Sequence, residues 1–405
     1  MPETLSVQCC IAGGGPAGMM LGLLLARAGV SVLVLEKHPD FLRDFRGDTL
    51  HPSTLEIMHE LGLLERFLQL PHQKVSRINA RFGDLEFTVA DFSRLPTQCR
   101  YVAFMPQWDF LNFLVEVGSR YSGFQVRMRA EVTDLIESEG SVVGLRAETA
   151  TGPLEVRAAL VVGADGRHSI VRRRAGLFVE EFGAPMDVLW FRLPRKPSDP
   201  VDPMGRFDAG RIFIMLNRGD YWQCGFVIAK GSLDEIRARG LPQFRDSVAK
   251  LAPFAADRVH ELQDWEPIKL LTVHVDRLRQ WHKPGLLCIG DAAHAMSPVG
   301  GVGINLAIQD AVAAANRLAR PLRNWQVTEA DVAKVQARRM WPTQLTQQAQ
   351  LIVQNRVIRH VLDSKVRLSP PWAVRLLAQF PVLRHIPARL IGVGIRPEHV
   401  QTPVG

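Results

Sequence analysis

The chain has 405 residues, of which 47% are apolar and 22% are charged, a composition typical of a folded globular protein rather than a disordered one. Its formal net charge of +8 favours anionic ligands such as phosphates, but lysine and arginine are dispersed along the chain, so we expect no nucleic-acid partner. The five cysteines show no C-x-x-C pair and no metal-site spacing, and their odd number argues against a disulfide framework. We therefore expect no bound metal and a reducing, cytoplasmic compartment.

No segment has the character of a secretion signal or a membrane span. The first strand is expected near Ser6, which leaves no room before it for a signal peptide. The longest apolar stretch, residues 19–35, is broken by Arg27 and Gly29, so it does not provide the roughly 20 uninterrupted apolar residues that a transmembrane helix needs.

The N-terminal segment has the pattern of a βαβ unit. VQCCIA, residues 7–12, predicts a buried strand, residues 19–28 predict a helix that ends at Gly29, and SVLVLE, residues 31–36, predicts a second strand. A glycine-rich turn, GGGPAG, occupies residues 13–18 between the first strand and the helix. This order predicts a Rossmann-like dinucleotide-binding unit.

Each glycine of the turn has a physical role in such a unit. Gly13 permits a tight turn, Gly15 lets the backbone approach a pyrophosphate, and Gly18 lets the helix pack closely on the strand. Glu36, at the end of the second strand, is placed to accept hydrogen bonds from an unphosphorylated ribose. Both FAD and NAD have such a ribose, so this unit alone does not distinguish them.

Two further motifs follow a strand in the same way. Residues 158–173 read as an apolar strand, an Asp165-Gly166 turn and a basic segment. Residues 286–291 predict a strand ending at Asp291, and residues 304–319 predict an alanine-rich helix. The glycine-rich segment between them would let backbone lie against a planar ring, where amides at the helix start could stabilise the negative charge of a reduced flavin.

In this order, GGGPAG, GADGRHSIVR and GDAAHAMSPVGGVGINLAIQDA resemble the class A flavoprotein monooxygenases, the family of p-hydroxybenzoate hydroxylase. The resemblance extends over about residues 5–320. It implies a tightly held FAD, with NADH or NADPH as a transient co-substrate. It also implies O2 as a substrate and a flavin C4a-hydroperoxide as the oxygenating species.

The resemblance implies a set of cofactor-binding positions: Gly13, Gly15, Pro16, Ala17, Gly18, Glu36, Lys37, Arg46, Gln107, Val132, Asp165, Gly166, Asp291, Pro298, Gly303, Ile304 and Asn305. Arg46 would contact a phosphate, Gln107 the FAD, and Val132 would lie beside the adenine. Asp165 would be shared by FAD and the nicotinamide, and Asp291 would bind ribityl hydroxyls. No side chain is assigned a catalytic role, so catalysis would depend on the flavin-facing loop at Pro298, Gly301 and Gly303.

Several of these residues have simpler alternatives. Arg43 is as readily a surface charge as a phosphate ligand, and Gln107 could cap its own helix. His294 is interpreted as a packing residue of the loop rather than as a base. Residues 53–56, Ser-Thr-Leu-Glu, have the pattern of a capping box for a helix starting near Ser53.

The motifs predict an α/β fold with a discontinuous FAD-binding domain. It would comprise residues 1–75, 99–180 and 285–330, with residues 76–98 and 181–284 forming an inserted, mostly antiparallel substrate sheet and residues 331–405 a helical region broken at Pro342 and at Pro370-Pro371. Strands are predicted at residues 188–194, on both sides of an RGD turn at 218–220, and at 270–275.

Apolar residues of this sheet could line a substrate cavity. We predict substrate contacts for Phe213, Met215, Trp222 and Phe226, with Trp190 and Phe191 as further candidates. The alternative is packing within the sheet, because side chains alternate between its two faces. The C-terminal helices are basic and amphipathic, and we interpret them as a helical cap with a solvated basic face in preference to a membrane-docking surface.

These observations predict an FAD-dependent monooxygenase that hydroxylates or epoxidises an apolar aromatic or polycyclic substrate. The chain does not offer the phenol-activating tyrosine pair of p-hydroxybenzoate hydroxylase, which argues against a small phenolic acid. The alternatives are a flavin-dependent reductase of a prenyl or quinone-like substrate and a non-catalytic flavoprotein. A flavin-dependent halogenase is disfavoured because the sequence has no W-x-W-x-I-P segment.

Overall fold

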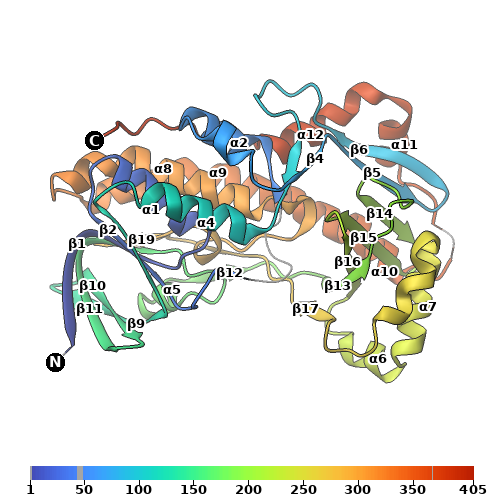
Figure 1. The fold of residues 1–405 in the computed structure, drawn as a ribbon, viewed down its shortest axis with the longest axis horizontal. Helices are drawn as coiled ribbons and strands as arrows, with labels where there is room; N and C mark the ends of the chain where they lie inside the picture. The colour runs from blue at the N-terminus through green and yellow to red at the C-terminus, as the bar shows by residue number, and fades with distance from the viewer. Residues whose placement is uncertain (1, 43–48, 367) are drawn as a thin grey trace.

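Two large β-sheets organise the chain (Figure 1). The structure, a computed structural model, describes residues 2–42, 49–366 and 368–405. Long helices lie beside the first sheet, and the second sheet lies at the other end of the molecule with shorter helices around it (Figure 1). The predicted α/β class, with an antiparallel sheet inserted into a Rossmann-like unit and a helical C-terminal region, is confirmed.

The first sheet contains the predicted βαβ unit. Its main path runs β19-β20-β11-β1-β2-β8, and from β20 to β8 the neighbours are parallel, with β9 and β10 attached to β11 as an antiparallel extension. The strands are β1 (Glu3–Ala12), β2 (Val32–Glu36), β8 (Phe124–Met128), β9 (Ala130–Ser138), β10 (Ser141–Thr149), β11 (Gly152–Gly163), β19 (His282–Lys283) and β20 (Leu286–Cys288). The interior strands are buried on both faces, which explains their uninterrupted apolar sequences.

Four helices pack together beside this sheet (Figure 1). They are α1 (Pro16–Arg27), α4 (Gln107–Gly118), α8 (Gly303–Arg323) and α9 (Glu329–Val353). The prediction that the chain breaks at Pro342 is wrong, because α9 continues through it. Pro342 is buried where α9 packs along α8, and this tertiary packing outweighs the helix-breaking tendency of proline.

The second sheet has the order β17-β13-β16-β15-β14-β5-β6 and is antiparallel except for the β14–β5 pair. Its strands are β5 (Arg77–Phe82), β6 (Leu85–Asp91), β13 (Met186–Pro194), β14 (Met204–Asp208), β15 (Arg211–Asn217), β16 (Tyr221–Ala229) and β17 (Lys269–Leu271). The strand predicted over 270–275 stops at Leu271. Beyond it, Val273 donates its backbone N–H to the side-chain carboxylate of Asp187 in β13 instead of to the backbone of that strand.

Two small sheets complete the strands. They are formed by β3 (Thr49–Leu50), β7 (Val102–Phe104) and β4 (Gln73–Val75), and by β12 (Val179–Glu181) with β18 (Asp276–Leu278). The remaining α-helices are α2 (Pro52–Glu60), α3 (Leu64–Phe67), α5 (Ile170–Arg174), α6 (Leu233–Ala238), α7 (Leu241–Leu251), α10 (Arg359–Asp363), α11 (Trp372–Gln379) and α12 (His385–Gly392). Among the described residues, none of these helices combines the length and apolar character needed to cross a bilayer.

The capping box predicted at residues 53–56 is wrong. Helix α2 begins one residue earlier, with Pro52 in its first turn and His51 as the N-cap residue. Thr54 instead donates its hydroxyl to Asn305 at 2.7 Å, and Glu56 accepts the backbone N–H of Gln98. The start of α2 is therefore tied to α8 rather than closed on itself.

Candidate active site

The three glycine-containing motifs meet at the carboxyl ends of neighbouring parallel strands. Ala12 of β1 pairs with Gly163 of β11, and Gly163 pairs with Cys288 of β20. The segments that follow these strands are in contact, since a Cβ on Gly290 would lie 3.2 Å from the Cβ of Ala17. Ligands of open α/β sheets bind at such carboxyl ends.

In the first loop, Gly13 is closely surrounded by protein atoms, whereas Gly15 has free space beside its Cα atom. Gly13 has φ of +105°, and a Cβ there would collide with the backbone carbonyl of Ala164, so this position requires glycine. A Cβ on Gly15 would meet no described heavy atom within 4 Å. Gly15 is the N-cap of α1, and no side chain of the described residues caps this helix. The helix start is therefore available to an anionic group such as a diphosphate.

Glu36 supports this loop from the end of β2. One carboxylate oxygen accepts the backbone N–H of Gly14 at 2.9 Å, and the other accepts that of His38 at 3.0 Å. The side chain is buried, with 9% of its residue surface exposed. These bonds fix the carboxylate beside the glycine turn. Lys37, the next residue, is exposed.

The Asp165 carboxylate holds the segment that follows β11. Its carboxylate accepts the Ser169 hydroxyl at 2.5 Å and the backbone N–H of Ile170 at 2.7 Å, so it holds the start of α5. Burial raises the pKa of Asp165, although these hydrogen bonds favour its ionised form. Gly166 has φ of +82°, which turns the chain between β11 and α5.

Three buried glutamines hold the loop that precedes α8, two of them on α9 and the third in the π-helical turn that directly follows it. Gln347 donates to the carbonyl of Ala295, and Gln354 donates to the Ser297 hydroxyl. Gln350 accepts the Ser297 backbone N–H at 3.2 Å and donates to the carbonyls of Ser297 and Val299 at 3.0 and 2.8 Å. The sequence analysis did not identify these residues, although their spacing of three and four places them on one helix face.

The start of α8, like that of α1, has no side-chain cap among the described residues. Val302 is its N-cap residue. Just before it, Gly300 and Gly301 have φ of +80° and +62°, and a Cβ on Gly301 would lie 2.8 Å from the Thr49 hydroxyl. Pro298 leads into this turn, and Gly303 begins the helix. The first backbone amides of α8 therefore have no side-chain cap among the described residues.

The Asn305 side chain is engaged within the protein. Its oxygen accepts the backbone N–H of His51 at 3.0 Å and the hydroxyl of Thr54 at 2.7 Å. His51 is buried, and its Nδ1 lies 2.7 Å from the carbonyl oxygen of Ile391. Burial lowers the pKa of His51 to about 4, so the ring is neutral near pH 7. Neither His51 nor Thr54 was identified from the sequence as a partner of this helix start, because the residues they bond are more than 200 positions away.

A buried charge cluster lies beneath the same loop. His294 Nε2 is 2.5 Å from one carboxylate oxygen of Asp310, and Arg339 donates to the other at 2.9 Å. Burial alone would raise the pKa of Asp310, but the neighbouring His294 and Arg339 hold it below its usual value. Asp310 also accepts the backbone N–H of Gly290 at 3.1 Å. His294 thus packs in the loop, in keeping with the interpretation from the sequence.

The remaining predicted cofactor positions are spread over several elements. Gln107 begins α4 and does not cap it, Val132 lies buried in β9, and Asp291 lies half-buried in the short 3-10 turn after β20. Ile304 is partly buried in the first turn of α8. Arg46 and Arg43 lie outside the described residues. The described residues contain no group of three or more His, Cys, Asp or Glu side chains that could hold a metal ion.

The four predicted substrate residues lie on the face of the second sheet that is covered by α7. Phe213, Met215, Trp222 and Phe226 belong to one hydrophobic cluster with Phe244 of α7. Trp222 also donates its indole N–H to Asp199 at 2.9 Å. This placement favours the alternative of packing within the sheet. Trp190 is on the opposite face, in a cluster that includes Val299 of the glycine-rich loop.

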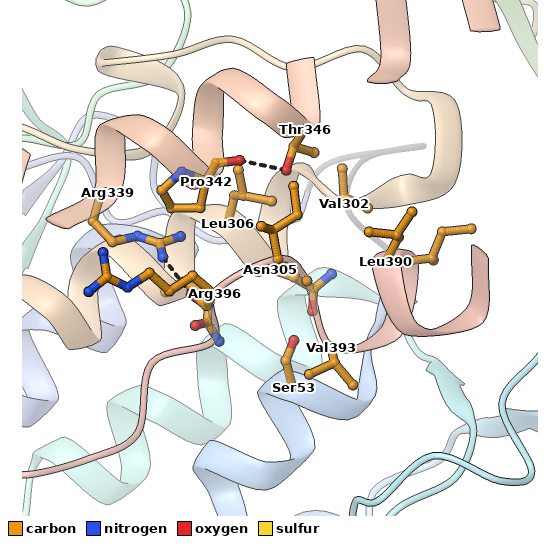
Figure 2. A pocket seen from close by; sticks show the side chains of 14 residues that line it. Ser53, Val302, Asn305, Leu306, Arg339, Pro342, Thr346, Leu390, Val393 and Arg396 are labelled. Atoms are coloured by element: carbon orange, nitrogen blue, oxygen red, sulfur yellow. Dashed lines mark hydrogen bonds between the residues drawn. The ribbon is translucent and has the colours of Figure 1, made fainter. Parts of the chain in front are cut away.

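A small pocket opens beside the start of α8 (Figure 2). Its walls come from α8, from α9 and from the C-terminal segment, including Asn305, Pro342, Leu390 and Arg396. Arg339 donates to the carbonyl of Arg396 across this region, as Figure 2 shows. The C-terminal segment is thus bonded to α9, and the backbone N–H of Glu398 is donated to Gln309 of α8.

A dinucleotide turn at one end and an open, glycine-rich helix start at the other define a flavoprotein site. The matching family model is the FAD binding domain, over residues 6–349. The chain is 31% identical over 385 residues to 6-methylpretetramide 4-monooxygenase from Streptomyces rimosus, an alignment that covers 94% of this chain and 91% of the relative.

Solved structures show the same fold. PqsL, a probable FAD-dependent monooxygenase from Pseudomonas aeruginosa, matches with a TM-score of 0.75 at 22% identity, covering 88% of this chain and 97% of its own. The p-nitrophenol 4-monooxygenase PnpA from Pseudomonas putida DLL-E4 matches with a TM-score of 0.76 at 20% identity, covering 96% and 97%. The chain belongs to the FAD-binding family of class A aromatic monooxygenases, which confirms the resemblance found in the sequence.

Proposed function

We propose that this flavoprotein monooxygenase uses NADH or NADPH and O2 to hydroxylate or epoxidise an apolar, polycyclic aromatic substrate. The observation that carries the proposal is the meeting of the three motifs at the carboxyl ends of β1, β11 and β20. The relative that acts as a 6-methylpretetramide 4-monooxygenase supports a polycyclic substrate, because the similarity extends over nearly both whole chains.

The residues present fit FAD. The start of α1 at Gly15 would hold the diphosphate, Glu36 the ribose, and Asp291 the ribityl hydroxyls. When bound, FAD supplies the redox chemistry that links NAD(P)H oxidation to oxygen transfer. The amides at the start of α8 would stabilise negative charge on the flavin ring, and no side-chain nucleophile is required.

The apolar face of the second sheet would form the wall of the substrate site. Trp190 packs against Gly225 of the neighbouring strand, where a Cβ would lie 3.0 Å from the indole ring. Val299 of the glycine-rich loop belongs to the same cluster. A flat aromatic substrate held between this face and the loop would be shielded from water by these apolar side chains.

The test is to follow NADH and NADPH oxidation together with O2 uptake, with and without fused-ring aromatic compounds, and to identify the products by mass spectrometry. Substrate-stimulated O2 uptake with a product that has gained oxygen is the expected result. Reduction of a substrate without O2 uptake would instead indicate the flavin-dependent reductase. FAD binding without NAD(P)H oxidation under any of these conditions would indicate a non-catalytic flavoprotein.

A further inference from the structure

Two short helices near the C-terminus expose apolar side chains in a regular pattern. The exposed stripe, as we call it here, consists of Trp372 (76% exposed), Leu376 (36%), Phe380 (50%), Val382 (67%), Ile386 (60%) and Leu390 (47%). Trp372, Leu376 and Phe380 are four apart and follow one face of α11 and the residue after it, and Ile386 and Leu390 are four apart on α12. Val382 lies in the short 3-10 turn that joins the two helices. Large apolar patches of this kind on a soluble surface mark interaction sites.

The stripe is not the side by which these helices are attached to the protein. Both helices contact β6, the edge strand of the second sheet. Ala388 of α12 is fully buried in a cluster with Phe92, and the His385 ring lies 3.1 Å from the carbonyl oxygen of Asp91. Ala388 of α12 and the partly buried Val374 of α11 thus pack inward, whereas the residues of the stripe face solvent.

The geometry of the two helices is fixed by Arg384. Its guanidinium group donates to the carbonyls of Leu377 and Ala378 at the end of α11, at 3.0 Å each. This arginine follows Pro381 in the short turn between the helices, so the bonds hold α11 in place relative to α12. Figure 1 places α11 and α12, the helices that carry the exposed stripe, on the part of the molecule away from the N-terminus.

The charge around the stripe has a single sign. Residues 364–397 contain no Asp or Glu, whereas they contain six basic residues: Lys365, Arg367, Arg375, Arg384, Arg389 and Arg396. Arg375 and Arg389 are exposed on the same helices as the stripe. A second copy of the chain would bring like charges together on this face, which disfavours a dimer. An anionic bilayer complements both features, because its headgroups attract arginine and its interface accepts apolar side chains.

We propose that α11 and α12 dock the protein on the surface of a membrane containing anionic phospholipids, with the exposed stripe inserted at the level of the headgroups. The helices have eight residues each, which suits a position in the interface plane rather than a span. This departs from the interpretation of the C-terminal helices as a purely solvated cap. The proposal does not depend on the identity of the substrate.

The test is flotation of the full-length holoprotein with phosphatidylcholine vesicles, with or without phosphatidylglycerol. We expect binding only to the anionic vesicles and release at high salt. Trp372→Ser with Phe380→Ser should lower the partition coefficient by roughly tenfold or more, and Arg375→Gln with Arg389→Gln should weaken binding and reduce its salt dependence. Retained FAD absorbance and an unchanged thermal midpoint would show that each variant is folded.

The matched control is Trp325→Ser. Trp325 is 57% exposed and lies in the turn between α8 and α9, at the other end of the molecule from α11 (Figure 1). Its replacement should leave vesicle binding unchanged. Absence of binding to anionic vesicles at low salt, or equal loss in the control, would overturn the proposal. So would a dimer in sedimentation velocity that dissociates on replacement of Trp372 and Phe380, or retention on an acidic polypeptide without any vesicle binding.

Discussion

The side chain of Gln350 in α9 forms hydrogen bonds with both the backbone N–H and the backbone carbonyl of Ser297 in the glycine-rich loop. Its side-chain oxygen accepts the Ser297 N–H, and its nitrogen donates to the Ser297 carbonyl, so one amide satisfies two backbone groups that are out of reach of water. An irregular loop that must lie against a ligand has few internal hydrogen bonds, and a buried amide from another element replaces them. The shape of this loop is therefore set by a helix about 50 residues further along the chain.

Replacing Gln350 should loosen the flavin without unfolding the protein. Gln350→Leu leaves the Ser297 N–H and carbonyl buried without these partners, at a cost of about 1–3 kcal/mol for each group. We expect FAD to dissociate roughly tenfold more readily, measured by fluorescence titration of apoprotein. Gln348→Leu is the control, because Gln348 is exposed on the same helix, and it should bind FAD normally. Equal affinities in the two variants would contradict a positioning role for Gln350.

Replacing two glycines of the first loop by alanine should affect different properties, FAD affinity at Gly15 and stability at Gly13. Gly15→Ala places a methyl group where no described protein atom lies within 4 Å, so the fold should persist while the methyl blocks the approach of the diphosphate. We expect at least a tenfold loss of FAD affinity with a near-normal apoprotein melting temperature. Gly13→Ala is strained by its φ of +105° and by Ala164, so it should destabilise the apoprotein by about 1–3 kcal/mol. A colourless, unfolded Gly15→Ala protein would argue against an open ligand approach at this position.

The contrast between these loops and the rest of the site shows what a sequence can predict. The turn at residues 13–18 is specified by local glycine chemistry, and it was predicted together with its flanking strands. The roles of the two faces of the second sheet were not predicted. Alternation separates Trp190 from Phe213, but that α7 covers the Phe213 face and α10 covers part of the Trp190 face depends on tertiary packing. The helical spacing of Gln347, Gln350 and Gln354 is visible in the chain, whereas their partners depend on how α9 docks.

The two faces of the second sheet should respond differently to mutation. Trp190→Leu removes an aromatic surface from the face shared with Val299, and we expect kcat/KM for a polycyclic substrate to fall by roughly tenfold, mainly through KM. Phe213→Leu leaves a gap under α7, and it should lower stability by about 1–2 kcal/mol while KM stays unchanged. Steady-state kinetics and urea unfolding measure the two effects. A raised KM in Phe213→Leu with none in Trp190→Leu would place the substrate on the other face.

His51 should make the protein sensitive to mild acid. Because burial depresses the pKa of His51 to about 4 in the folded state, against 6.5 for an ordinary histidine, the unfolded chain binds a proton that the folded chain rejects. Stability is complete above pH 6.5 and decreases as the pH falls towards 4, by an amount on the order of 3 kcal/mol. His51→Gln keeps a donor for the Ile391 carbonyl but does not titrate, so it should reduce this slope. Urea unfolding between pH 4.5 and 7.5 tests the difference, and parallel curves for the two proteins would exclude His51 as the source. His51 lies beside Gly301 and donates its backbone N–H to Asn305. In the protein that retains His51, FAD release should therefore increase as the pH falls from 6.5 towards 4.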